Sequence, residues 1–243
     1  MNSKYRYLIP NGITFLSLTC GIVSITAAIV GNFLLGGSLI LVSYILDLFD
    51  GATARRLNAS SEFGLQLDSL VDMVSLGAAP AVLAFAHLYH NDHTLTFVWP
   101  ATVLFVLAGA YRLARFNLLP PKKTGVKDSV GLTISAAGAT LALAVLADIS
   151  PYVTSQGWDF MPDDLFFPLM IILSLLMVSR IPYPSFGQVF GHKWMTPMGL
   201  GGAFLLWYLF SFLNAWFLCS IGYLTLSLAR AGYNRAYESQ PQQ

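Results

Sequence analysis

Apolar stretches alternate with short polar connections along nearly the whole chain. Most of these stretches approach the length of about 20 residues that a helix needs to cross a bilayer. We expect about eight membrane helices, at residues 12–30, 33–55, 65–88, 97–117, 130–149, 165–180, 197–212 and 215–230. The last two are short and nearly continuous, so they form either a pair or one bent or re-entrant element. The pattern predicts an all-α polytopic membrane helix bundle of six helices plus a C-terminal pair.

Composition agrees with this pattern and excludes a water-soluble globule. Hydrophobic residues make up 56% of the 243 residues and charged residues only 10%, which leaves too few polar side chains to cover a soluble protein. Because no hydrophilic stretch is long enough for a separate domain, we predict a single integral membrane domain over residues 1–243. The net charge of +1 and the absence of an interleaved basic and aromatic pattern argue against a nucleic-acid partner.

The basic residues predict an orientation. All 13 Lys and Arg fall at the termini or in alternate connections, whereas the other connections carry acidic residues such as Asp92, Asp148 and Asp159. Connections rich in Lys and Arg stay on the cytoplasmic side of a membrane. We therefore expect both termini in the cytoplasm and an even number of spans. The four histidines lie near connections without a second ligand pattern, so the sequence assigns them no role.

Four aspartates lie within a short stretch of this apolar chain. On the first of two predicted helices the functional positions follow i, i+3, i+7 spacing, at Asp47, Asp50 and Ala54. On the second they follow i, i+4, i+8 spacing, at Gly64, Asp68 and Asp72. Each helix would therefore turn one carboxylate-bearing face toward a common centre. Acids near a membrane are costly and point to function, and carboxylate oxygens suit Mg²⁺ or Mn²⁺.

The complete motif resembles the signature of the CDP-alcohol phosphotransferases. Its order is Asp, two residues, Asp-Gly, two residues, Ala-Arg, about eight residues, Gly, three residues, Asp, three residues, Asp, and every fixed position is filled between Asp47 and Asp72. This pattern is far more specific than a single glycine-rich loop. The resemblance implies the membrane bundle of that family, with a catalytic core at about 8–190, a C-terminal helical pair at about 197–230 and a homodimer.

The resemblance also implies a role for each motif residue. Two divalent cations, Mg²⁺ or Mn²⁺, would be held by Asp47, Asp50, Asp68 and Asp72. Asp68 would be catalytic, and Asp72 would act as general base on the acceptor hydroxyl. The CDP group and its diphosphate would lie against Gly51, Ala54, Arg55 and Gly64. Gly51 and Ala54 also have the small size that suits close helix packing in membranes.

Three further segments resemble the membrane-integral phosphatidylserine synthases, at residues 72–80, 111–117 and 179–186. The resemblance implies transfer of a phosphatidyl group from CDP-diacylglycerol to L-serine with release of CMP, among membrane lipids. It also implies a bacterial or archaeal inner membrane with the active site facing the cytoplasm. A serine carboxylate needs a cation, and Arg112, Arg115 and Arg180 are the candidates. Each could instead be an ordinary cytoplasmic anchor.

Two alternatives remain open at this point. Ser17 and the segment 131–135 differ from the residues that are usual in the serine enzymes, so a sister enzyme could use glycerol phosphate, inositol phosphate or another alcohol. A cation or proton transporter could also use intramembrane carboxylates. A transporter would be expected to show internal repeats with broken helices near the midplane, whereas these acids gather at one helix end.

Overall fold

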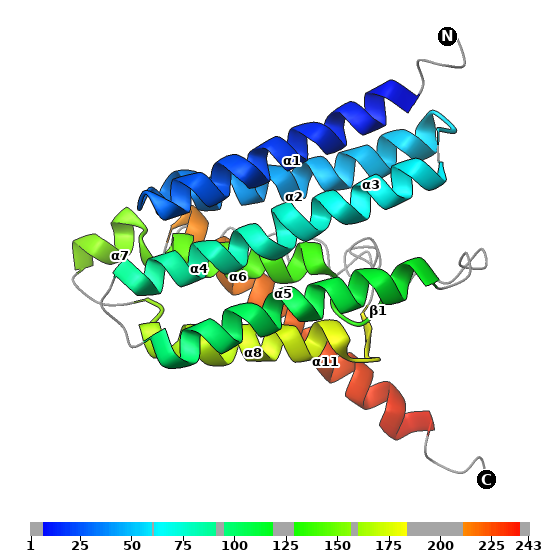
Figure 1. Cartoon of the computed structure of the whole chain (residues 1–243). Helices are drawn as coiled ribbons and strands as arrows, with labels where there is room; N and C mark the ends of the chain where they lie inside the picture. The colour runs from blue at the N-terminus through cyan, green and yellow to red at the C-terminus, as the bar shows by residue number, and fades with distance from the viewer. Residues whose placement is uncertain are drawn as a thin grey trace.

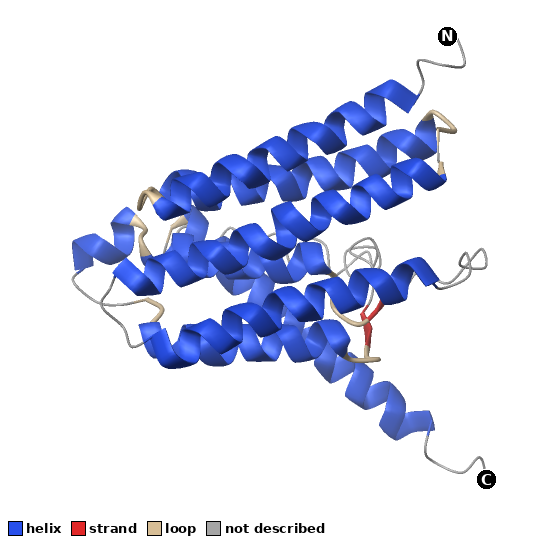
Figure 2. Cartoon of the chain, viewed as in Figure 1, coloured by secondary structure: helices blue, strands red, loops and turns tan. Residues whose placement is uncertain are grey.

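The computed structural model describes residues 7–59, 61–90, 95–118, 129–156, 160–183 and 211–238. Helices dominate this part of the chain (Figure 2). They are α1 (Leu8–Ile29), α2 (Phe33–Arg56), α3 (Glu62–Asp72), the π-helix η2 (Met73–Ala78), α4 (Ala79–His90), α5 (Leu95–Leu118), α6 (Ile134–Asp148), α7 (Pro151–Gln156), α8 (Asp163–Val178) and α11 (Phe212–Glu238). Two short strands, β1 (Ser129–Val130) and β2 (Pro182–Tyr183), pair in antiparallel fashion.

Successive long helices run back and forth, so the connections gather at two ends of a bundle (Figure 1). The end of α2, the start of α3 and the ends of α5 and α8 lie on the right of that view. The end of α4, the start of α5, α7 and the start of α8 lie on the left. α1 packs along α2, and α11 leaves the bundle at an angle (Figure 1).

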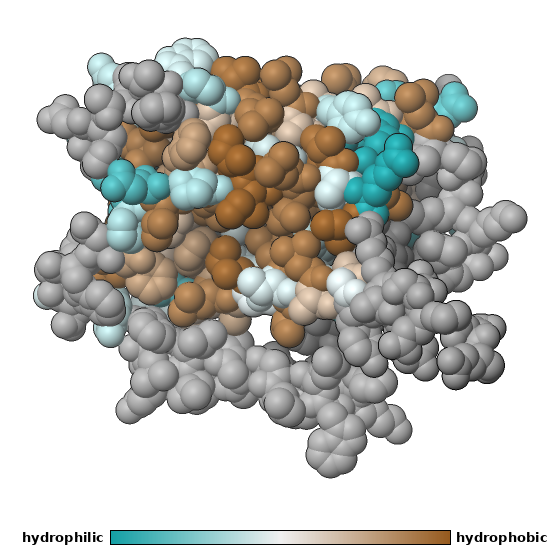
Figure 3. Space-filling view, turned by 90° about the horizontal axis from the view of Figure 1, so that it is seen from below, coloured by the Kyte–Doolittle hydropathy of each residue, from teal (hydrophilic) through white to brown (hydrophobic). Residues whose placement is uncertain are grey.

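Five helical segments are long and apolar enough to cross a membrane. They are Leu8–Ile29, Phe33–Arg56, Glu62–His90, Ile134–Val153 and Phe212–Gly232. Figure 3 shows apolar residues over the middle of the described surface, with hydrophilic residues toward its edges. Large exposed apolar side chains would be unfavourable in water and are the expected lining of a lipid-facing surface. The prediction of an all-α, multi-pass membrane protein is confirmed.

Several predicted boundaries differ from the structure. The helix expected at 130–149 begins only at Ile134, because Ser129–Val130 pairs with Pro182–Tyr183 and Gly131 adopts a left-handed φ of 80°. The helix expected at 215–230 is α11, which is longer. The helix expected at 197–212 lies almost entirely outside the described residues, so the total of eight stays a prediction.

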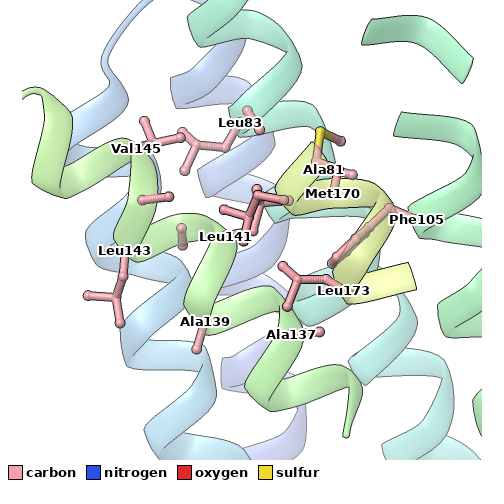
Figure 4. Packing of buried hydrophobic residues seen from close by; sticks show 14 of the residues in the cluster. Ala81, Leu83, Phe105, Ala137, Ala139, Leu141, Leu143, Val145, Met170 and Leu173 are labelled. Atoms are coloured by element: carbon pink, nitrogen blue, oxygen red, sulfur yellow. The ribbon is translucent and has the colours of Figure 1, made fainter. Parts of the chain in front are cut away.

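The helix α6 forms the centre of the apolar core. Nearly all of its side chains from Ala137 onward are buried, as expected for a helix that is hydrophobic all round. Figure 4 shows Val145 of α6 near Leu83 of α4, and Leu141 of α6 near Met170 of α8. Gly138 lies so close to the backbone oxygen of Leu76 in η2 that a side chain has no room. Small residues allow this close approach of backbones inside membranes.

We predict that the two ends of the bundle face opposite sides of the membrane. A cysteine at Asp164→Cys should react with an impermeant maleimide added outside intact cells, while one at Arg56→Cys should react only after permeabilisation. Both side chains are exposed, and the native Cys20 and Cys219 would first be replaced by Ala. Labelling of both positions from the same side would contradict the orientation.

Candidate active site

A tight reversal between α2 and α3 brings the two halves of the aspartate motif together. Asn58 takes a positive φ of 49° just after α2, and the Ala59 N–H donates to the Ala54 oxygen over 2.9 Å. Ser61 then caps α3, because its Oγ accepts a hydrogen bond of 3.0 Å from the Gly64 N–H. An N-cap of this kind satisfies a free amide of the first helical turn. The chain therefore turns back within a few residues, and the motif faces of both helices meet.

Three carboxylates converge at this reversal. Asp47 and Asp50 of α2 and Asp68 of α3 each offer an oxygen, and these atoms lie within 4.8 Å of one another. Asp50 is only 5% exposed, and the other two are partly buried. Burying several carboxylates without a counter-charge is strongly unfavourable. An all-carboxylate donor set fits a hard divalent cation, so the residues present fit the predicted kind of metal.

Asp72 lies beside this group at the junction of two kinds of helix. It is 8% exposed, and it interacts electrostatically with Asp47, Asp68 and Asp50. The π-helix η2 starts at the next residue, Met73, and such wide turns occur often at functional sites. Asp72 is not part of the three-oxygen group, so its role as a metal ligand stays a prediction. Its position next to the group suits the predicted general base.

Two hydroxyl groups lie against the carboxylates, and the sequence analysis identified neither of them. Thr14 of α1 is buried, and its Oγ1 donates to Asp50 Oδ2 over 2.8 Å. The Ser135 side chain, in the first turn of α6, interacts with the Asp47 carboxylate. The available signal for Thr14 was that it shares one face of the apolar α1 with Ser17 and Ser24, both of which are buried. No comparable signal exists for Ser135.

Two of the predicted diphosphate-binding residues, Gly51 and Arg55, lie beside Asp50 of the same group. Gly51 follows Asp50, and a Cβ built on it would lie 3.4 Å from Arg55 Nη1, so the missing side chain leaves room for this guanidinium. Arg55 is exposed and interacts electrostatically with Asp50. Gly64 faces α1, where a Cβ would lie 3.6 Å from Asn11 Oδ1. Arg55 therefore supplies an exposed positive charge beside the carboxylates, and contact of Gly51, Arg55 and Gly64 with substrate stays a prediction.

Arg112 is the predicted acceptor-binding residue that faces the carboxylates. Its side chain is buried, with 7% of its surface exposed, and it interacts electrostatically with Asp72 and Asp47. Its Nε has no hydrogen-bond partner among the described residues. Asn117, on the same helix, donates to Ser69 Oγ over 3.1 Å and so ties α5 to α3.

Arg115 and Arg180 lie in different surroundings. The Arg115 guanidinium donates to three backbone oxygens, those of Val178 at 2.9 Å, Val130 at 2.8 Å and Ser179 at 3.2 Å. These bonds join the strand β1 to the end of α8, so Arg115 has a structural role. Arg180 is exposed, just beyond the end of α8. The structure therefore separates three arginines that the sequence treated alike.

Comparisons with known proteins bear on this site. The model of the CDP-alcohol phosphatidyltransferase family matches residues 7–178. A Helicobacter pylori protein named CDP-diacylglycerol--serine O-phosphatidyltransferase is 37% identical, over 77% of this chain and 75% of the relative. A Methanocaldococcus jannaschii protein of the same name is 36% identical, over 73% of this chain and 74% of the relative. An archaetidylserine synthase of Methanothermobacter thermautotrophicus is 33% identical, over 72% and 69%.

Proposed function

The chain belongs to the CDP-alcohol phosphatidyltransferase family, and on that premise we propose that it transfers a phosphatidyl group from CDP-diacylglycerol to L-serine. The products are phosphatidylserine and CMP, so the enzyme acts in phospholipid biosynthesis. The observation that carries the proposal is the group of Asp47, Asp50 and Asp68 at one end of a membrane bundle, with Arg112 beside it. The names of all three relatives described above include serine.

The transfer is a single displacement at phosphorus. The serine hydroxyl oxygen forms a bond to the phosphorus that carries diacylglycerol, and the bond from this phosphorus to the CMP oxygen breaks. The hydroxyl proton has to be removed as the bond forms, and we assign this task to Asp72 because it is buried next to the other three carboxylates. Asp72 is also next to Arg112, which places the base beside the proposed anchor for serine.

The carboxylates require a counter-charge, and so does the substrate. We propose two divalent ions, Mg²⁺ or Mn²⁺, held by Asp47, Asp50 and Asp68 with Asp72 beside them. When bound, such ions supply positive charge to the diphosphate and to the departing CMP. Thr14 contributes by fixing the orientation of Asp50 through its hydrogen bond, and Ser135 interacts with Asp47.

Among the arginines, Arg112 is the best candidate for the serine carboxylate. A guanidinium fork binds a carboxylate through two parallel hydrogen bonds. Arg112 is buried near Asp72 and retains an Nε without a hydrogen-bond partner among the described residues, so it has a donor to offer. Arg115 already donates to three carbonyl oxygens. We also propose that the whole chain forms one domain and, from the family resemblance, that it works as a homodimer.

The function is tested with purified full-length protein, CDP-diacylglycerol and Mg²⁺. Serine, glycerol phosphate, inositol phosphate and inositol are supplied one at a time, and both CMP release and the lipid product are measured. We expect CMP release and a new lipid with serine only. A preference for a phosphorylated alcohol would replace the serine assignment with a sister enzyme, and no CMP release with any acceptor would contradict the enzyme assignment.

We predict that Arg112→Ala raises the KM for serine by about 10²-fold or more while changing the KM for CDP-diacylglycerol far less. The reason is that a lost charge-assisted contact of about 3 kcal/mol would belong to one substrate only. Steady-state kinetics with each substrate varied in turn provide the measurement. Arg112→Lys should remain impaired, because an ammonium keeps the charge without the paired donors.

Arg115→Ala is the matched comparison. It removes the three backbone hydrogen bonds that join β1 to the end of α8, so it should lower the melting temperature and leave the KM for serine close to wild type. If Arg112→Ala keeps wild-type serine kinetics while Arg115→Ala or Arg180→Ala loses them, the assignment to Arg112 is wrong.

A further inference from the structure

A second group of metal-ligating side chains lies at the other end of the bundle. It consists of His87 near the end of α4, Asp148 at the end of α6 and Asp163 at the start of α8. Asp72 and His87 share the continuous helical segment Glu62–His90. At 1.5 Å per helical residue, their separation in sequence places them roughly 20 Å apart. This group is therefore separate from the active-site carboxylates.

The three side chains converge closely. Each offers one ligand atom, and these atoms lie within 4.8 Å of one another. His87 Nε2 lies 3.1 Å from Asp148 Oδ2, and the Asp148 Oδ1 accepts a hydrogen bond of 3.4 Å from the Met161 N–H. Each oxygen of Asp148 therefore contacts a neighbouring group, and the residue links α4 to the segment that leads into α8.

The His87 ring is fixed from two sides. Its centroid lies 5.2 Å from the Phe33 ring and 5.6 Å from the Phe166 ring, and only 3% of the residue is exposed. Its Nδ1 has no hydrogen-bond partner among the described residues. A buried imidazole normally uses both nitrogens, and here Nε2, the nitrogen that faces Asp148, is the one donor atom that His87 offers to this group.

We propose that His87, Asp148 and Asp163 form a binding site for a divalent transition-metal ion, Zn²⁺. One imidazole and two carboxylates are a donor set that Zn²⁺ accepts, with a fourth position left for water. Two partly buried carboxylates this close together repel each other, and a divalent cation removes that cost. The ion would join the end of α4, the end of α6 and the start of α8.

The donor types separate this site from the active site. Asp47, Asp50 and Asp68 supply oxygen only, which suits Mg²⁺ or Mn²⁺. The second site includes a nitrogen donor, which favours Zn²⁺ over a strongly hydrated Mg²⁺. An excess of Mg²⁺ should therefore compete at the first site and leave zinc bound at the second.

The test uses purified full-length protein in detergent, equilibrated with Zn²⁺ in the presence of millimolar Mg²⁺ and passed through a desalting column. Zinc bound per chain is measured by mass spectrometry, and affinity is measured by competition with a chromophoric chelator. We expect Asp163→Asn to lose one zinc per chain or to weaken its binding by at least about tenfold. Asp164→Asn is the matched control, because Asp164 is exposed in the same helical turn and lies outside the group.

Thermal unfolding gives a second readout that does not depend on activity. Zn²⁺ should raise the melting temperature of the wild type and of Asp164→Asn, but not that of Asp163→Asn. Asp163→Asn leaves the His87–Asp148 contact in place, which limits the risk of misfolding, and His87→Gln provides an independent variant. If the wild type retains no more zinc than Asp163→Asn under these conditions, the site is not a zinc site and the group is only a polar contact between helices.

Discussion

Asp68→Asn and Asp47→Asn will each reduce phosphatidyl transfer by about 10³-fold or more. Each change removes a carboxylate from a group whose oxygens lie within 4.8 Å of one another, and an amide oxygen carries no charge with which to hold a divalent cation. The variant site then binds divalent ions more weakly, so the negative charge of the substrate diphosphate is neutralised less well. The measurement is CMP release from CDP-diacylglycerol with serine, over a range of Mg²⁺ and Mn²⁺ concentrations.

A folding control separates this loss from damage to the bundle. In the presence of a chelator, neither variant should melt below the wild type, because each removes one of several carboxylates that repel one another in the empty site. Asp164→Asn serves as the matched control for activity, since its carboxylate is exposed and lies outside the group. Full turnover of either variant at ordinary metal concentration would contradict the assignment of these carboxylates to a metal site.

Gly138→Ala is the second change for which we expect a large effect. A Cβ at this position would overlap the Leu76 oxygen and would lie 3.0 Å from the Leu76 carbonyl carbon and 3.1 Å from Pro80 Cγ. Because two of these three contacts are with backbone, α6 and η2 have to move apart. Overpacking of this kind costs about 1–3 kcal/mol or more, which corresponds to about 2–4 °C in melting temperature per kcal/mol for a chain of this size.

The same displacement should also lower activity, because η2 begins immediately after Asp72. Gly222→Ala is the matched control. A Cβ at Gly222 meets nothing within 4 Å, so this change should be neutral or slightly stabilising through the higher helix propensity of Ala. Equal melting temperatures for Gly138→Ala and the wild type would show that the close approach of α6 to η2 is not required.

The convergence of Asp47, Asp50 and Asp68 could be predicted from the sequence because their arrangement is local. Asp47 and Asp50 lie on one helix, and Asp68 lies on the next. The short connection between the two helices turns the chain back, so that these carboxylates converge. Helical spacing alone then determines which side chains meet. The same reasoning predicted a multi-pass membrane protein, because hydropathy over about 20 residues is a property of a single segment.

Such local patterns could not predict contacts between residues that are far apart in the sequence. The hydrogen bond from Thr14 to Asp50 crosses 36 positions, and the partners of Arg115 lie up to 64 positions away. No helical period links residues at such distances. For this reason the sequence could not separate Arg112, which faces the carboxylates, from Arg115, which holds backbone oxygens.

His87 shows most clearly the difference between local patterns and long-range contacts. The sequence assigned His87 no role, since it lies near a connection without a recognisable ligand pattern. The packing of α4 against α6 brings it within 3.1 Å of Asp148, 61 positions later, and the start of α8 adds Asp163. By itself, the sequence determined the membrane class, the family and the carboxylate motif, because these depend on composition and local spacing. Tertiary structure alone decided which arginine faces the site and where His87 finds its partners, because helix packing joins residues that no local pattern connects.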